Sequence, residues 1–165
     1  MSRKRSSTKP APPEPVFFVD ADLSDAHFHA ILSAAGVRFE RHDDHFAQGA
    51  DDLEWLVKAG ENDWVVLSHN KSLRYVSAQT ERLFESSVRV FMLMGKARPN
   101  PAGHRSIFTR ELAENFVNTL PAVQRFLRRH PRTWIAKLYR PSDLSPGAPG
   151  EIKMWLTLQA WLKGR

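Results

Sequence analysis

Acidic and amide side chains follow two short apolar runs of the chain, at the points where strands would end. Asp20 directly follows the run at residues 16–19, and Asp22 lies two positions further on. Asn70 follows a second run, at residues 64–67. Several oxygen-bearing side chains in one place can bind Mg²⁺ or Mn²⁺, which prefer hard oxygen ligands and accept phosphate oxygens. A metal held in this way can activate water and stabilise the charge that develops when a phosphodiester is cleaved.

A second acidic group, Asp52 and Glu54, lies between those two runs, at the start of an expected helix. Asp51 or Asp52 would also serve that helix as its N-cap, which is the simpler reason for an aspartate at this place. Ligands of an open parallel sheet bind beyond the carboxyl ends of its strands, so such a sheet can bring this group to Asp20. The spacing of the acids leaves both a metal site and ordinary capping open.

The elements that would position these side chains alternate along the first part of the chain. Short apolar or alternating runs predict strands, and apolar residues at helical spacing predict the helices between them. The expected strands are residues 16–19, 37–40, 64–67 and 88–93, the expected helices are residues 24–35, 51–59 and 71–86, and residues 41–50 are expected to be a loop. Strands that alternate with helices imply a parallel sheet with right-handed crossovers.

The remainder of the chain predicts two further helices and a strand pair. A loop rich in Gly, Pro and Asn at residues 95–106 precedes expected helices at residues 107–119 and 121–129. A strand at residues 133–139 can pair with residues 151–158 in a hairpin, although the last segment also fits a helix. We therefore expect an α/β fold of three layers, with a mostly parallel central sheet and a C-terminal β-hairpin.

Composition indicates one folded domain. The chain has 165 residues, of which 42% are hydrophobic, and this length and composition fit a single core, expected over residues 16–165. Residues 1–15 are basic and rich in Pro and Ser, and we expect them to be a disordered arm. The absence of cysteine excludes a disulfide scaffold, a thiolate zinc site and a cysteine nucleophile. No apolar run approaches the roughly 18 residues of a membrane span, and no signal-peptide run follows the start, so we expect a cytoplasmic protein with no membrane partner.

Charge is divided unevenly along the chain. Residues 16–63 contain eleven acidic and three basic residues, a net charge of −8, whereas residues 64–165 contain six acidic and seventeen basic residues, a net charge of +11. A basic surface suits a polyanion such as RNA, and phosphate contacts make that binding salt-dependent. The densest basic run contains Arg125, Arg128 and Arg129, which either bind the RNA backbone or form a solvated helix face.

Two cations occupy an unusual place directly after Asn70. Lys71 and Arg74 lie in the first turn of the helix expected at residues 71–86, where the helix dipole disfavours positive charge. A nearby anion would remove that penalty. The position therefore favours a contact of these two side chains with phosphate.

A polar cluster, His-Asp-Asp-His, occupies residues 42–45 of the expected loop. Histidine and carboxylate side chains are zinc ligands, so a zinc site is one interpretation. A solvated loop is the other and the simpler one.

Three runs of the sequence, taken in order, carry a resemblance to a known family. They are FFVDADLSDAHFHAILSAAGVRFERHDD at residues 17–44, ADDLEWLVKAGENDWVVLSHNKSLRY at residues 50–75, and VRVFMLMG at residues 88–95. Together they resemble the PIN-like domains related to VapC-type toxin ribonucleases. The runs TWIAKLYRP and PGEIKMWL, later in the chain, look like the C-terminal strand pair of that family.

The resemblance implies a role for each residue that matches a family position. Asp20 matches the acid that closes the first strand, and Asp22 is a nearby supporting acid. Asp52 matches the aspartate of a D-x-E-W turn, here Asp-Leu-Glu-Trp, and Glu54 is an accessory candidate. Asn70 stands at the end of the third strand, where the family usually has Asp. Asparagine still offers a carbonyl oxygen but brings no charge, so the affinity for a metal is expected to fall.

The function that the resemblance implies is that of an Mg²⁺- or Mn²⁺-dependent endoribonuclease, the toxin of a type II toxin–antitoxin pair. Its partners would be RNA, a cognate antitoxin protein and a second copy in a homodimer. Asp20, Asp52 and Asn70 would hold the metal, while Asp22 and Glu54 would orient water or a second ion. The alternative is a catalytically impaired PIN-like module, disabled by Asn70, that binds nucleic acid or a protein partner.

Overall fold

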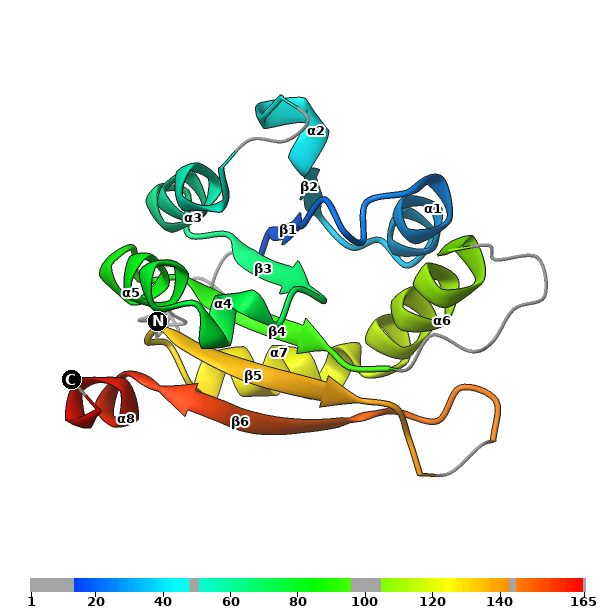
Figure 1. Ribbon diagram of the computed structural model, residues 1–165. Coiled ribbons are helices and arrows are strands. Elements are labelled where there is room, and N and C mark those ends of the chain that lie inside the picture. The colour runs from blue at the N-terminus through cyan, green and yellow to red at the C-terminus, as the bar shows by residue number, and fades with distance from the viewer. Residues whose placement is uncertain (1–13, 48–50, 96–104, 143–144, 165) are drawn as a thin grey trace, which may run out of the picture.

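Six strands form one sheet in the computed structural model, which describes residues 14–47, 51–95, 105–142 and 145–164 (Figure 1). The strands lie in the order β2-β1-β3-β4-β5-β6. Their bounds are Phe17–Val19 for β1, Phe39–Arg41 for β2, Val65–Ser68 for β3, Arg89–Leu93 for β4, Trp134–Tyr139 for β5 and Glu151–Thr157 for β6. All neighbours pair in parallel except β5 and β6, which form an antiparallel pair. The expected α/β fold with a C-terminal hairpin is confirmed.

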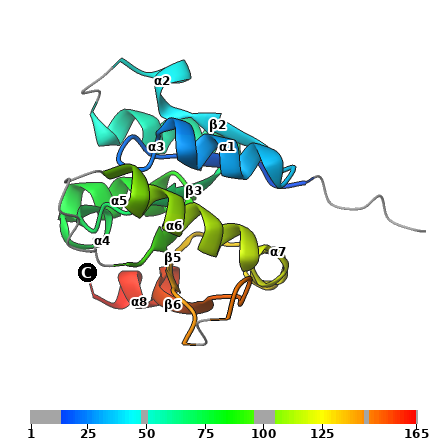
Figure 2. The ribbon, with the colours of Figure 1, turned by 90° about the vertical axis from the view of Figure 1, so that its right-hand side faces the viewer.

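Eight helices connect and follow these strands in the described residues. They are α1 (Ala26–Ala34), α2 (His42–His45), α3 (Asp52–Glu61), α4 (Ser72–Tyr75), α5 (Ser77–Glu85), α6 (Arg105–Asn118), α7 (Leu120–Arg129) and α8 (Leu158–Lys163). Helices α1, α6 and α7 pack on one face of the sheet, and α3, α4 and α5 pack on the other. Figure 2 views the molecule from the side of α1 and α6.

Alternation along the strands divides the apolar residues between two cores. On β1, Phe17 and Val19 belong to the core beneath α1, α6 and α7, whereas Phe18 belongs to the core beneath α3 and α5. Successive side chains of a strand point to opposite faces, so a strand covered on both faces is apolar throughout. This double coverage explains the short, uninterrupted apolar runs in the sequence.

Phe18 is the centre of an aromatic stack in the second core. Its ring is fully buried, and its centroid lies 5.5 Å from the centroids of both Trp55 and Trp64. Burial of one Phe side chain stabilises a fold by about 1.5–3 kcal/mol, so this stack anchors α3 to β1 and to the start of β3. It fixes the helix that carries Asp52 relative to the strand that ends at Asp20.

The structure differs from the expected elements mainly in short helices. The segment expected as a loop contains α2, and the helix expected at residues 71–86 is interrupted at Val76, whose backbone is extended with φ −84° and ψ 112°. Thr80 stabilises the interruption, because its hydroxyl donates to the carbonyl oxygens of Leu73 and Val76, over 2.8 and 3.2 Å. The last segment was expected to be either a strand or a helix, and it contains both. Strand β6 ends at Thr157, and α8 begins at the next residue.

Close approach of two helices explains why α3 continues through Gly60, where a helix stop was expected. A Cβ atom at Gly60 would lie 2.0 Å from the carbonyl oxygen of Ser86. Only glycine leaves room for this contact between α3 and the end of α5. The glycine therefore serves packing here rather than termination of the helix.

The described part of the chain contains no helix that is both long enough and apolar enough to cross a membrane. The arm expected at residues 1–15 lies outside the described residues, apart from residues 14 and 15. Most of the loop expected at residues 95–106 also lies outside them.

Candidate active site

Asp20 lies at the carboxyl end of β1 and is held there by two residues of β3. Its backbone N–H donates to the carbonyl oxygen of Leu67 over 3.0 Å, which continues the parallel pairing of the two strands. Its Oδ2 atom accepts a hydrogen bond of 2.7 Å from the hydroxyl of Ser68, and its Oδ1 atom accepts one of 2.7 Å from the backbone N–H of Ala21. The Asp20 residue is only 4% exposed. Its carboxylate is therefore a positioned group rather than a solvated one.

Asp22 lies in the turn after β1 and faces the same strand end. The turn is closed by the backbone N–H of Leu23, which donates to the carbonyl oxygen of Asp20 over 3.0 Å. The Oδ2 atom of Asp22 accepts a hydrogen bond of 3.2 Å from the backbone N–H of His69. Asp20 and Asp22 are thus bonded to two successive residues, Ser68 and His69. The structure brings these two carboxylates together, as the positions of the apolar runs predicted.

Asn70 joins the same group through Ser68. Its backbone N–H donates to the hydroxyl oxygen of Ser68 over 3.0 Å, and that hydroxyl in turn donates to Asp20. The side-chain oxygen of Asn70 accepts from the backbone N–H and the hydroxyl of Ser72, over 3.1 and 2.6 Å. Asn70 therefore lies at the site, but its side-chain oxygen already accepts two hydrogen bonds from Ser72, in the first turn of α4.

Ser68 and His69 complete the site, and their role exceeds what the sequence indicated. The ring Nδ1 of His69 lies 2.7 Å from the carbonyl oxygen of Leu93 at the end of β4. A carbonyl oxygen can only accept, so Nδ1 carries a proton and donates this hydrogen bond. This bond ties the site to a third strand end. The signal in the sequence was a polar Ser-His-Asn run directly after a fully apolar strand.

The acids of α3 are only partly placed by the structure. Asp51 is the N-cap, because its Oδ1 atom accepts from the backbone N–H of Leu53 over 3.0 Å. Asp52 is the first residue of α3, and its side chain lies outside the described residues. Glu54 is exposed. Because α3 leads back to the start of β3, its first turn lies toward the edge of the sheet where β1 ends.

The cations predicted to bind phosphate lie in three different places. Lys71 is exposed next to Asn70, at the start of α4. The guanidinium of Arg74 instead lies 5.7 Å from the ring centroid of Trp155 on β6. The arginines of α7 are exposed on the helix that leads into the start of β5, at the end of the strands away from Asp20. They are Arg125, Arg128 and Arg129. Of these cations, the backbone places Lys71 nearest to Asp20.

The residues at this edge suit a magnesium ion better than a closed zinc centre. In the described ranges, no group of three or more His, Asp or Glu side chains could hold a metal. Magnesium needs only one or two carboxylates, because water and phosphate oxygens complete its shell. Asp20 and Asp22 supply two carboxylates at this edge. The donor set therefore fits Mg²⁺ or Mn²⁺ with a hydrated shell.

The His-Asp-Asp-His cluster of α2 has a structural role. His42 is buried, with its ring centroid 6.0 Å from that of Phe18. His45 pairs with Glu40, at 2.9 Å between Nε2 and Oε2. The two histidines thus contact the core and β2, which accounts for the cluster without a zinc ion.

His29 is a buried histidine near the candidate site. Burial lowers its pKa from the usual 6.5, and the charge of Arg41 lowers it further. Its Nε2 atom lies 2.8 Å from the hydroxyl of Ser24, and its ring stacks on Phe39. Asp25 does not extend this pair into a Ser-His-Asp relay, because its carboxylate accepts from the N–H of Phe28 and the hydroxyl of Thr109.

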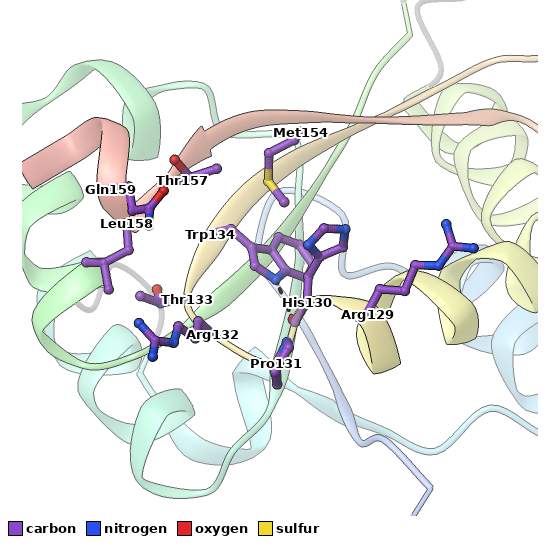
Figure 3. Close-up of a pocket in the computed structure, with 10 residues that line it drawn as sticks. All are labelled: Arg129, His130, Pro131, Arg132, Thr133, Trp134, Met154, Thr157, Leu158 and Gln159. Carbon is purple, nitrogen blue, oxygen red and sulfur yellow. Dashed lines mark hydrogen bonds between the residues drawn. The ribbon is translucent and has the colours of Figure 1, made fainter. Parts of the chain in front are cut away.

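A cavity of about 410 Å³ lies near the start of β5 and the end of β6, at the end of the sheet away from Asp20 (Figure 3). It is bounded by the connection from α7 to β5 and by the junction of β6 with α8. The indole N–H of Trp134 donates to the carbonyl oxygen of His130 over 2.7 Å at its rim. The Asp20 group does not line this cavity.

Comparison with known proteins gives one match. Residues 15–95 match the family model described as a PIN-like domain. No significant match was found among curated proteins, and none among solved structures. The matched segment contains β1 to β4 and α1 to α5, and it ends before α6 and the β5–β6 hairpin. Asp20, Asp22, Asp52 and Asn70 all lie within the matched segment.

Proposed function

We propose that this protein is a metal-dependent endoribonuclease whose active site lies at the carboxyl ends of β1 and β3. The observation that carries the proposal is the hydrogen bonding of Asp20 to Ser68 and of Asp22 to His69. It gathers two carboxylates at one strand edge, within the segment that matches PIN-like domains. Ligands of parallel sheets bind at such an edge, and the PIN-like match favours nuclease chemistry.

Asp20, Asp22 and Asp52 are the residues that would hold Mg²⁺ or Mn²⁺, with the Asn70 oxygen as a weaker ligand. The bound ion would supply an activated water and would stabilise the charge of the cleaved phosphodiester. Ser68 fixes the orientation of the Asp20 carboxylate. Burial of Asp20 makes a nearby cation favourable, because a desolvated charge is costly unless it is paired.

Lys71 and Glu54 would act at the rim of the site. Lys71 is exposed beside Asn70, where its ammonium can contact a phosphate of the bound strand. Glu54 is exposed on the first turns of α3 and could orient water. Both remain predictions from the sequence.

The test is cleavage of a labelled RNA panel, with a matched DNA panel, while Mg²⁺ or Mn²⁺ is titrated. Wild-type protein should cleave RNA only when the ion is present. Asp20→Asn should lose cleavage, whereas Asp43→Asn, which neutralises an exposed acid of α2, should retain it. Circular dichroism should show that both variants are folded. Equal cleavage by wild-type protein and Asp20→Asn contradicts the proposal.

The biological role we propose is that of the toxin of a type II toxin–antitoxin pair, which rests on the resemblance to VapC-type ribonucleases. A cognate antitoxin and a homodimer belong to the same proposal. Expression of the wild-type protein should arrest growth of a bacterial host, and Asp20→Asn should not. Growth arrest that persists in the Asp20→Asn variant contradicts a toxic ribonuclease.

Asn70 supports a second candidate function, a PIN-like module that binds nucleic acid or a protein without cleaving. Its side-chain oxygen is already bonded twice to Ser72, and it carries no charge for a metal. Under this alternative, wild-type protein should be inactive, and Asn70→Asp should bind metal and gain cleavage. Metal-dependent cleavage by the wild-type protein favours the enzyme instead.

A further inference from the structure

The outer face of the C-terminal hairpin carries a cluster of cations and aromatic rings. On β5, Trp134, Ala136 and Leu138 point into the core beneath α6 and α7, so Lys137 and Tyr139 point to the other face. The side chains that gather on this face come from β5, β6 and α4, and we call them the hairpin surface; they are Arg74, Tyr75, Lys137, Tyr139, Lys153 and Trp155.

A β-bulge directs Trp155 toward this surface. Leu156 pairs with Ile135 and Met154 pairs with Ala136, so Trp155 is the extra residue of β6 and has no register partner. Bulges bend a strand and re-aim a side chain. Trp155 consequently lies beneath Lys137, with 4.0 Å between the ammonium nitrogen and the ring centroid.

Two like charges lie side by side on this surface. Lys137 and Lys153 are directly opposite each other in the antiparallel pair, an arrangement that destabilises a sheet. Arg74 approaches the ring of Trp155 at 5.7 Å, so it shares that ring with Lys137. In the described ranges, the ion pair at these cations is Lys153 with Glu151, at 4.0 Å. The cluster keeps a net positive charge, which an anion would offset.

An exposed aromatic ring completes the surface. Tyr75 is 68% exposed, and its ring packs edge-on against Trp155 with 5.5 Å between centroids. This contact fixes the ring while most of it stays open to solvent. Aromatic rings among cations are typical of surfaces that bind single-stranded nucleic acid, because bases stack on the rings and phosphates contact the cations.

The hairpin surface is joined to the candidate active site. Helix α4, which carries Arg74 and Tyr75, begins directly after the Ser68-His69-Asn70 turn. Tyr139 ends β5 at the same edge of the sheet, since β4 and β5 are parallel. A strand bound along this surface would therefore lead toward Asp20.

We propose that the hairpin surface binds single-stranded nucleic acid and leads it to the carboxylate site. The proposal rests on the proposed function for its purpose, but its residues lie mainly beyond the PIN-like segment, on β5 and β6. Tyr75 is the stacking ring, and Lys137 and Lys153 contact phosphates. Trp155 is a positioning residue that holds Arg74 and Lys137 side by side.

The experiment measures binding of the full chain to a fluorescent 12-nucleotide single strand, by anisotropy in EDTA so that no cleavage occurs. Tyr75→Ala should raise Kd by about fivefold or more, since loss of one stacked base costs about 1–3 kcal/mol. Lys153→Gln should lower the slope of log Kd against log salt concentration by about 0.7, because one phosphate contact is lost. Both replaced side chains are exposed, so the fold should be unaffected.

Arg38→Gln is the matched control, because it removes one exposed positive charge directly before β2, the edge strand at the other side of the sheet. Its Kd should stay within about twofold of wild type, as expected for a charge outside the binding surface. Single-stranded RNA and DNA should both bind more tightly than a duplex of the same length. The proposal is overturned if Tyr75→Ala and Lys153→Gln bind like Arg38→Gln, if the duplex binds more tightly, or if no strand binds.

Failure of this proposal is distinguishable from failure of the proposed function. Weakened binding by Tyr75→Ala together with no cleavage by wild-type protein supports the hairpin surface and rejects the nuclease. Normal binding by Tyr75→Ala, together with cleavage that Asp20→Asn abolishes, rejects the hairpin surface and supports the nuclease.

Discussion

The hydroxyl of Ser68 donates a hydrogen bond of 2.7 Å to Oδ2 of Asp20 and joins two strand ends that are 48 residues apart in the chain. The same hydroxyl accepts from the backbone N–H of Asn70. One small side chain therefore orients both the best-placed acid of the site and the turn that follows β3.

Ser68→Ala should weaken the site without removing a carboxylate. The variant leaves Asp20 Oδ2 and the N–H of Asn70 without this partner, which should lower the free energy of unfolding by about 1–3 kcal/mol. Loss of an orienting partner should lower metal affinity and cleavage by about 10–100-fold. Urea unfolding and metal titration measure the two effects. Ser33→Ala, an exposed serine of α1, should change neither, and equal results for the two variants would reject the role of Ser68.

Asn70→Asp should fold normally and bind Mg²⁺ more tightly. An aspartate oxygen can accept the same hydrogen bonds from Ser72 that Asn70 accepts, and Asp caps a helix as well as Asn does. The added charge should raise Mg²⁺ affinity by about tenfold, because ligand charge tunes affinity over decades. Isothermal titration calorimetry measures the change. Unchanged affinity would mean that residue 70 does not contact the ion.

Phe18→Ala should be severely destabilising. The ring is fully buried and stacked between Trp55 and Trp64, so its removal leaves a cavity that should cost about 3–5 kcal/mol. Denaturant unfolding gives this number. Tyr75→Ala removes an exposed ring, and its cost should stay within about 0.5 kcal/mol. Similar losses for the two variants would contradict the placement of Phe18 at the core.

Stability should fall as the pH drops through the range in which histidine titrates, and His29 should account for part of the loss. Burial holds the pKa of His29 below its usual 6.5 in the folded protein. The unfolded chain therefore binds a proton at a higher pH than the folded one, so acidification below about pH 6.5 favours unfolding. Above that range the ring is neutral in both states, and this contribution to stability is complete.

His29→Gln should flatten that dependence. Glutamine can still bond to Ser24 but does not titrate. Unfolding free energies at pH 5.5 and 7.5 should therefore differ less in the variant than in the wild type. An equal difference in both proteins would show that His29 is not the group responsible.

Much of the fold could be predicted because local patterns determine it. The apolar run of β1 is followed by Asp20, and a similar run precedes Ser68. Both strands, and the meeting of their carboxyl ends in a parallel sheet, could therefore be predicted. The N-cap of α3 could be narrowed to Asp51 or Asp52 but not decided, since both side chains suit the position. The structure selects Asp51.

Other features depend on contacts between distant residues and could not be predicted locally. The break at Val76 is stabilised by the hydroxyl of Thr80. The contact of the Arg74 guanidinium with the ring of Trp155 joins residues about eighty positions apart in the sequence, so no local pattern could predict it. The bulge at Trp155 likewise depends on the pairing of β6 with β5.

The most direct test of the account is the rate of RNA cleavage by purified wild-type protein and Asp20→Asn at saturating Mg²⁺, with EDTA as the blank. The account predicts cleavage by the wild type that EDTA abolishes. It predicts a rate for the folded Asp20→Asn variant below about one hundredth of wild type, since residues that only orient metal ligands already change activity by 10–100-fold. Cleavage by Asp20→Asn at the wild-type rate, or wild-type cleavage that persists in EDTA, would contradict a metal-dependent site at Asp20.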